Sequence, residues 1–124
     1  MKIELPWPNS DLLPNRRNGR HWSVTQAAKV AAKSDAAWAT KKAQFDAPHE
    51  TVDVETQAEV TIICNPPDSR GRDVDGILSS LKPSLDAIAE TLGINDRLFN
   101  PIIIYREQAL PDGRVTVIIE QVPF

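Results

Sequence analysis

The chain has 124 residues, of which 41% are hydrophobic and 25% are charged, so we expect one folded domain over residues 1–124. No apolar run approaches the roughly 20 residues that a membrane-spanning helix needs, and the opening MKIELPWP lacks the apolar segment of a signal peptide. We therefore expect no membrane partner. The net charge of −3 argues weakly against a nucleic-acid partner, because such domains usually carry a basic surplus.

The distribution of charge weakens that argument. Residues 1–50 hold eight Lys and Arg against five Asp and Glu, whereas residues 51–124 hold six against twelve. A cluster of acidic side chains that binds cations would explain part of the second imbalance, since bound metal reverses the local field. The single cysteine, Cys64, excludes an intramolecular disulfide framework and a cysteine-based zinc site. It fits a reducing cytosol, so we expect a cytoplasmic protein.

Residues 2–7 read as a short strand ended by Pro6 and Pro8. The loop PNSDLLPNRRNGRHWS follows, with an aromatic residue, Trp22, beside its basic side chains. Such a mixture can bind a phosphate backbone, or it can be a solvated loop whose tryptophan packs on the core. The basic candidates are Arg16, Arg17, Arg20 and His21.

A long helix is predicted next, because Ser23 and Gln26 have the spacing of a capping box and Pro48 supplies a stop. Its apolar residues recur at helical spacing, and the alanine-rich face suggests close packing against a sheet. These residues are Val24, Ala27, Ala28, Ala31, Trp38 and Phe45.

Residues 52–64 alternate between apolar and polar, which predicts a half-buried strand. Residues 101–107 read as an interior strand, Pro111-Asp112-Gly113 as a turn, and residues 115–119 as the last strand. Together with the central helix described below, the order is β-α-β-α-β-β. The predicted fold class is α/β of the α+β type, with two helices packed on a small mixed sheet.

The stretch from 70 to 96, RGRDVDGILSSLKPSLDAIAETLGIND, concentrates the charged chemistry. Asp73 and Asp75 lie between the end of a strand and the start of a helix. Two carboxylates at one spot repel each other, and a cation relieves that repulsion. Oxygen ligands of this kind suit Mg²⁺ or Mn²⁺. In the structural alternative, Asp75 caps the helix that begins at Gly76.

The helix after these aspartates has a core stripe and a charged side. Lys82 and Asp86 are four residues apart and can form an ordinary ion pair, while Pro83 should kink the helix. Gly93 then ends it. Asp96 follows in the next loop, and it can meet Asp73 and Asp75 only if both helix ends border one groove. The core stripe consists of Ile77, Leu81, Leu85, Ile88 and Leu92.

The order and spacing of these pieces resemble the RusA family of Holliday-junction resolvases over nearly the whole chain. The matching segments are IELPWPNS, RRNGRHWS, RGRDVDG, KPSLDAI and ND. Two positions depart from the family pattern. Gly76 stands where asparagine is common in the family, and Lys82 lies three positions further from Asp75 than the family's lysine does from the matching aspartate.

The resemblance implies a RusA-like resolvase domain that acts as a homodimer on four-way DNA junctions in recombination and repair. It also implies paired, Mg²⁺-dependent nicks on opposing strands, in a bacterial or phage protein. Asp73, Asp75 and Asp96 match the family's metal-binding aspartates, and Lys82 matches its catalytic-site lysine. The family's basic run corresponds to Arg70 and Arg72, and we expect these two arginines and the basic loop to bind the junction backbone. Asp86 is expected to serve as a partner of Lys82.

Two other classes of function remain open. A metal-dependent nucleotide hydrolase could use the same Asp-x-Asp pair, although the sequence has no glycine-rich phosphate loop. A non-catalytic DNA-binding or regulatory protein of the same fold is the second alternative, and Gly76 and the displaced Lys82 keep it open.

Overall fold

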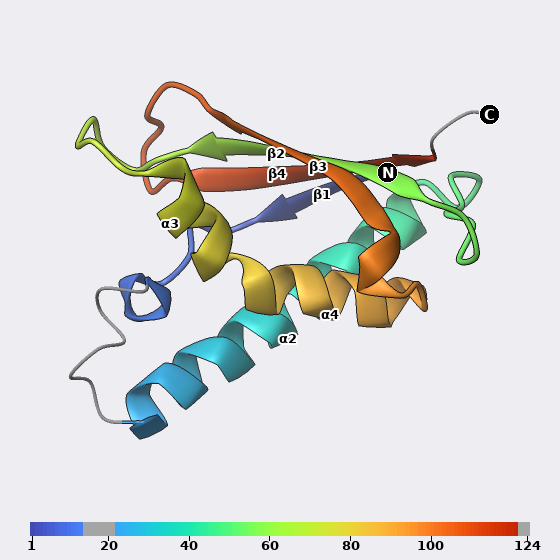
Figure 1. Ribbon diagram of the computed structural model, residues 1–124, viewed down its shortest axis with the longest axis horizontal. Coiled ribbons are helices and arrows are strands. Elements are labelled where there is room, and N and C mark those ends of the chain that lie inside the picture. Colours follow the sequence, from blue (N-terminus) through green and yellow to red (C-terminus); the bar gives the residue numbers. More distant parts are fainter. Residues whose placement is uncertain (14–21, 122–124) are drawn as a thin grey trace.

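The computed structural model describes residues 1–13 and 22–121, which form one four-stranded mixed sheet with the helices on one face (Figure 1). The α+β fold class predicted from the sequence is confirmed. Its elements are β1 Lys2–Leu5, η1 Ser10–Leu12, α2 Trp22–Asp46, β2 Ala58–Asn65, α3 Val74–Ser80, α4 Lys82–Leu92, η2 Asp96–Leu98, β3 Phe99–Arg106 and β4 Arg114–Gln121.

The strands lie in the order β1-β4-β2-β3, with β2 and β3 parallel and the other two pairings antiparallel. A parallel pair needs a crossover connection, and α3 and α4 supply it. The prediction that residues 101–107 form an interior strand is wrong, because β3 lies at the edge of the sheet and, among the strands that the structure describes, pairs only with β2. Pro101 has no N–H to donate, so it is tolerated at an edge.

The second strand is shorter than its alternating pattern predicts. It begins at Ala58, whereas residues 52–57 form bends and irregular backbone. Side chains satisfy the backbone of this segment: the Asp53 carboxylate accepts from the Glu55 N–H, and Gln121 accepts from the Asp53 N–H while donating to the Gln57 carbonyl. These bonds replace the ladder that a strand would provide.

The core lies between the sheet and the helices. Alternate residues of β2, including Val60, Ile62 and Cys64, have no exposed surface, and they share one core cluster with Ile88 of α4. The predicted helical core stripe is confirmed at Ile77, Leu81, Leu85 and Ile88, which are buried, while Leu92 is half-buried.

Helix α2 faces the core differently from the prediction. It presents Ala28, Ala36 and Thr40 to the interior, while Trp38 and Phe45 are 70% and 84% exposed. The predicted packing of the Trp38 and Phe45 side against the sheet is therefore wrong, because α2 has alanines on both sides and its periodicity does not choose between them. Ser23 lies in the first turn of α2 as described, directly after Trp22. None of the described helices combines the length and the apolar composition that crossing a bilayer requires.

Candidate functional site

The predicted central helix is divided in two at Leu81, which fixes the position of Lys82. Leu81 has φ −89° and ψ −6°, and its N–H still bonds the carbonyls of Ile77 and Leu78. Lys82 begins α4, and Pro83 lies in its first turn, where a missing N–H costs little. The break thus occurs before the proline, and Lys82 starts a new helix instead of continuing the old one.

Asp96 returns toward Lys82 because the chain reverses at the end of α4. Gly93 has a positive φ of 78°, as predicted for the residue that ends this helix, and the Ile94 N–H bonds back to the Ala89 carbonyl at 3.0 Å. Ile94 is buried, which anchors the reversal. The Asn95 carboxamide then accepts from the Arg97 N–H at 3.0 Å and caps η2, whose first residue is Asp96.

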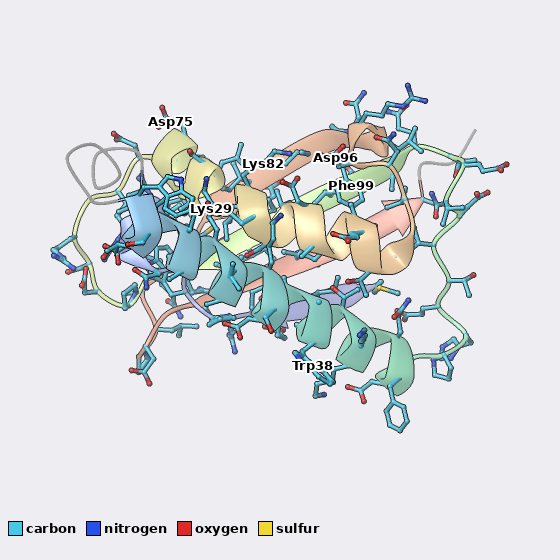
Figure 2. The ribbon with its side chains drawn as sticks, turned by 90° about the horizontal axis from the view of Figure 1, so that it is seen from below. Lys29, Trp38, Asp75, Lys82, Asp96 and Phe99 are labelled. Atoms are coloured by element: carbon cyan, nitrogen blue, oxygen red, sulfur yellow. The ribbon has the colours of Figure 1, made fainter. Side chains whose placement is uncertain are left out.

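Lys82 donates to two carboxylates at once. Its Nζ lies 2.7 Å from Oδ1 of Asp86, as the sequence predicts, and 3.1 Å from Oδ2 of Asp96, fourteen residues away. Asp86 and then Asp96 raise the pKa of Lys82, and the hydrogen bond from Lys82 lowers the pKa of Asp96. Figure 2 shows Lys82 and Asp96 along one side of α4. Two predicted site residues therefore meet in the fold.

Asp73 and Asp75 lie at the other end of this region, in the wall of a cavity of about 770 Å³. Asp73 is the N-cap residue of α3, in extended conformation, yet its side chain makes no capping bond. Asp75 lies in the first turn of α3, and its carboxylate accepts from the N–H of Gly76 at 3.0 Å. The structural alternative, in which Asp75 caps a helix that begins at Gly76, is thus wrong. Both aspartates are exposed.

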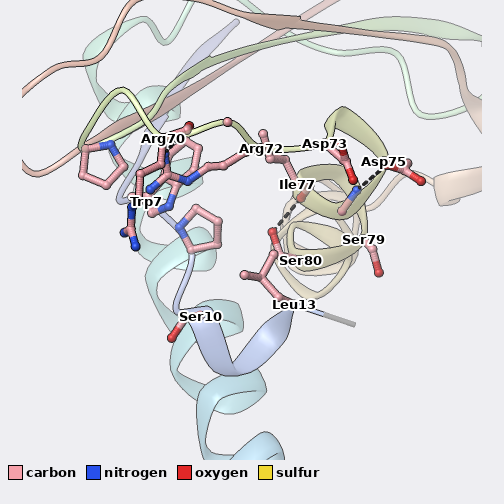
Figure 3. Close-up of a pocket in the computed structure, with 14 residues that line it drawn as sticks. Trp7, Ser10, Leu13, Arg70, Arg72, Asp73, Asp75, Ile77, Ser79 and Ser80 are labelled. Atoms are coloured by element: carbon pink, nitrogen blue, oxygen red, sulfur yellow. Dashed lines mark hydrogen bonds between the residues drawn. The ribbon is translucent and has the colours of Figure 1, made fainter. Parts of the chain in front are cut away.

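Two arginines, Arg70 and Arg72, line the same cavity (Figure 3). Both form ion pairs with Asp68. Nη2 of Arg70 and Nη1 of Arg72 each lie 3.0 Å from a carboxylate oxygen of Asp68, and these contacts hold the pKa of Asp68 well below its usual range. Asp68 in turn raises the pKa of Arg70. Arg70 is 77% exposed at its side chain, against 19% for Arg72, so only Arg70 extends freely toward solvent.

Arg72 has a structural role in addition to its charge. Its guanidinium donates to the carbonyls of Asp68 and Arg70 and lies 5.5 Å from the centre of the Trp7 ring, as a cation–π contact. Arg106 of β3 donates to the Arg72 carbonyl. The loop before α3 is therefore held between β1 and β3. Trp7 and Asp68 were not among the predicted site residues; the spacing of Asp68 from Arg72 could have indicated their ion pair, but nothing local indicates Trp7.

The predicted metal ligands do not form one group in this structure. In residues 1–13 and 22–121, no three side chains of His, Cys, Asp or Glu lie close enough together to hold a metal ion. Asp96 shares the Lys82 ammonium with Asp86, while Asp73 and Asp75 lie at the start of α3. As they lie, these residues do not fit an ion coordinated by all three. The predicted basic residues Arg16, Arg17, Arg20 and His21 lie outside the described residues.

The site thus combines exposed carboxylates, a lysine and arginines along the crossover of a small α+β domain.

No protein-family model matches the chain. It is 32% identical over 117 residues to an uncharacterized protein of the bacterium Xylella fastidiosa, strain Temecula1, and the match covers 94% of this chain and 74% of that protein. The chain belongs to the same family as that bacterial protein.

Proposed function

We propose that this chain is a structure-selective endonuclease of the RusA type, which resolves four-way DNA junctions by paired nicks. The observation that carries the proposal is the contact between Lys82 and Asp96. These residues come from separate pieces of the motif pattern, and the fold brings them within 3.1 Å of each other. Figure 2 shows Asp75 on the same side of the crossover.

The charges of the site are suited to phosphate chemistry only with help from cations. Within the cavity wall, Arg70 and Arg72 face Asp73 and Asp75, and Asp68 already pairs with both arginines. A phosphodiester that approaches Asp73 and Asp75 is therefore repelled unless positive charge accompanies it. Lys82 already bonds both Asp86 and Asp96, whereas the exposed guanidinium of Arg70 can contact a backbone phosphate.

The proposal includes a requirement for Mg²⁺, with Mn²⁺ as a substitute, which rests on the resemblance of the sequence to the RusA family. It also includes a homodimer, since two copies related by a two-fold axis match the two-fold symmetry of a junction and give paired nicks a geometric reason. A cytoplasmic location, in a bacterium or its phage, completes the proposal.

The test is cleavage of a synthetic four-way junction, with a linear duplex of the same sequence as a second substrate, in Mg²⁺, in Mn²⁺ and in EDTA. The wild type is expected to nick the junction symmetrically in Mg²⁺ and to leave the duplex intact. Asp75→Asn should abolish nicking and retain junction binding. Asp35→Asn is the matched control, because Asp35 is an exposed aspartate of α2, away from the cavity. Hydrolysis of a free nucleotide with no junction cleavage would instead favour a nucleotide hydrolase.

A second candidate is a DNA-binding or regulatory protein of the same fold that does not cut. The observation in its favour is that the described residues do not gather three metal-ligating side chains. It predicts tight, salt-dependent junction binding with no nicks in either Mg²⁺ or Mn²⁺. Asp75→Asn would then bind the junction at least as tightly, because it removes a negative charge from the cavity wall.

A further inference from the structure

Helix α2 exposes two aromatic rings that the proposed function does not use. Trp38 and Phe45 are 70% and 84% exposed. They are two helical turns apart, so both lie on one side of α2, about 10 Å from each other along its axis. That side faces away from the buried Ala28 and Ala36, and Figure 2 shows Trp38 directed away from the sheet. Exposed aromatic surface of this kind marks an interaction site in soluble proteins.

Lysines without acidic partners lie along the same helix. Within residues 1–13 and 22–121, no carboxylate forms an ion pair with Lys29, Lys33 or Lys41. Lys33 and Lys41, about 12 Å apart along the axis, line a groove between α2 and α4. Lys42 differs, because it is paired with Asp46. Since α2 carries four lysines against two aspartates in a chain of net charge −3, this helix has a local surplus of positive charge.

The shape of this surface suits nucleobases better than the side chains of a protein partner. Residues that anchor a protein partner generally enter a well-packed pocket. Trp38 and Phe45 do not belong to the wall of the groove between α2 and α4, and both project from the rounded outer side of the helix. A flat, exposed ring is instead what an unpaired base stacks on, with little dependence on its sequence. Lysines beside such rings attract the phosphates that connect the bases.

We propose that the solvent side of α2 binds single-stranded nucleic acid, with bases stacked on Trp38 and Phe45 and phosphates on Lys33 and Lys41. The Nζ of Lys41 lies 5.3 Å from the centre of the Trp38 ring, so one lysine is next to a stacking position and also reaches the adjoining phosphate. None of these four residues lines the cavity beside α3. The strand therefore binds at a site separate from the proposed nuclease site.

Stacking is tested with two labelled strands of about 15 nucleotides, an oligothymidylate and an abasic strand with the same phosphates. Fluorescence anisotropy in EDTA should show that the wild type binds the oligothymidylate at least about 10-fold more tightly. Trp38→Ala/Phe45→Ala should abolish this preference while circular dichroism stays unchanged. Tyr105→Ala, which removes an exposed ring of β3, is the control and should keep it. Equal binding of the two strands by the wild type, or a preference that survives in Trp38→Ala/Phe45→Ala, would overturn the proposal.

The salt dependence of binding tests the lysines. For a single strand, the slope of log K against log salt is about −0.7 for each phosphate contact. Lys33→Gln/Lys41→Gln should therefore make the slope less steep by about 1.4. Lys42→Gln is the control, because Lys42 is already paired with Asp46, and its slope should equal that of the wild type. An unchanged slope in Lys33→Gln/Lys41→Gln would show that the strand does not lie along this groove.

Other occupants of the same surface give other results. An amphipathic peptide of glutamate and leucine that binds here when the oligothymidylate does not would assign the surface to an acidic protein partner and overturn the proposal. Self-association of the wild type that Trp38→Ala/Phe45→Ala abolishes, measured by sedimentation without nucleic acid, would also overturn it. These measurements contain neither a junction nor a divalent cation. A wild type that nicks junctions but does not bind the oligothymidylate would therefore refute this inference alone, and the reverse result would refute only the nuclease.

Discussion

Replacing Gly113 by alanine is expected to destabilise the fold by about 2–5 kcal/mol. Gly113 has a positive φ of 70°, and a side chain in this conformation costs about 1–2 kcal/mol. A Cβ at this position would also lie 2.9 Å from Cβ of Trp7 and 3.1 Å from both Cδ and N of Pro67. Because all three of these atoms belong to the backbone or are bonded to it, the neighbours must shift, which adds roughly 1–3 kcal/mol.

Gly93→Ala separates the cost of the positive φ from the cost of the close contacts. Gly93 also has a positive φ, 78°, but a Cβ there would have no neighbour within 4 Å. This control should therefore lose only the conformational part, about 1–2 kcal/mol. Urea unfolding followed by circular dichroism gives both free energies of unfolding. Equal losses for the two variants would contradict the close contact between the β3–β4 turn and Trp7.

Three further predictions concern the crossover helices and the core. Gly76→Ala should raise the free energy of unfolding by about 0.5–1 kcal/mol, because Gly76 is inside α3 and a Cβ meets nothing within 4 Å; a loss of stability in urea unfolding would refute this. Lys82→Met should raise the pKa of Asp96, measured by carboxyl NMR, since Lys82 is what lowers it. The Lys82–Asp96 pair stabilises the fold above the unfolded pKa of Asp96, and that contribution is lost as the pH falls through the lowered folded value. Cys64, whose pKa burial raises to about 11, should react with a thiol reagent at pH 8 only after unfolding; rapid reaction of the native protein would contradict its burial.

Features that depend on local spacing were predictable from the sequence. The buried stripe of α3 and α4 follows helical periodicity, Gly93 ends α4 as expected, and Lys82 bonds Asp86 one turn away. The mixed sheet also follows, because a helix between two strands implies a crossover. Each of these rests on residues close together in the chain.

Contacts between distant segments were not predictable in the same way. The pairing of Lys82 with Asp96 depends on the reversal at Gly93 and the burial of Ile94, and the contact of Arg72 with Trp7 joins residues 65 positions apart. The separation of Asp73 and Asp75 from Asp96 also depends on how distant segments are arranged in the fold. Sequence could place these residues at two ends of a helical segment, but only the break at Leu81 decides how the ends are oriented.

Alternating or repeated patterns were misleading where two arrangements satisfy them equally. Residues 52–57 alternate like a strand, yet side-chain bonds from Asp53 and Gln121 hold them in bends. The α2 helix has small residues on both sides, so its periodicity does not show whether Trp38 faces the core or the solvent. In both cases the deciding interactions come from a distant part of the fold.

The most direct test of the central claim is the single-turnover rate of junction nicking by Asp96→Asn. If Asp96 and Lys82 act in one site with Asp73 and Asp75, the rate should fall at least about 100-fold, and Asp75→Asn/Asp96→Asn should be no slower than the slower single variant. Stability should change little, because the Lys82–Asp96 pair is largely exposed. A wild-type rate in Asp96→Asn would contradict the account, because Asp96 would then be only a surface partner of Lys82.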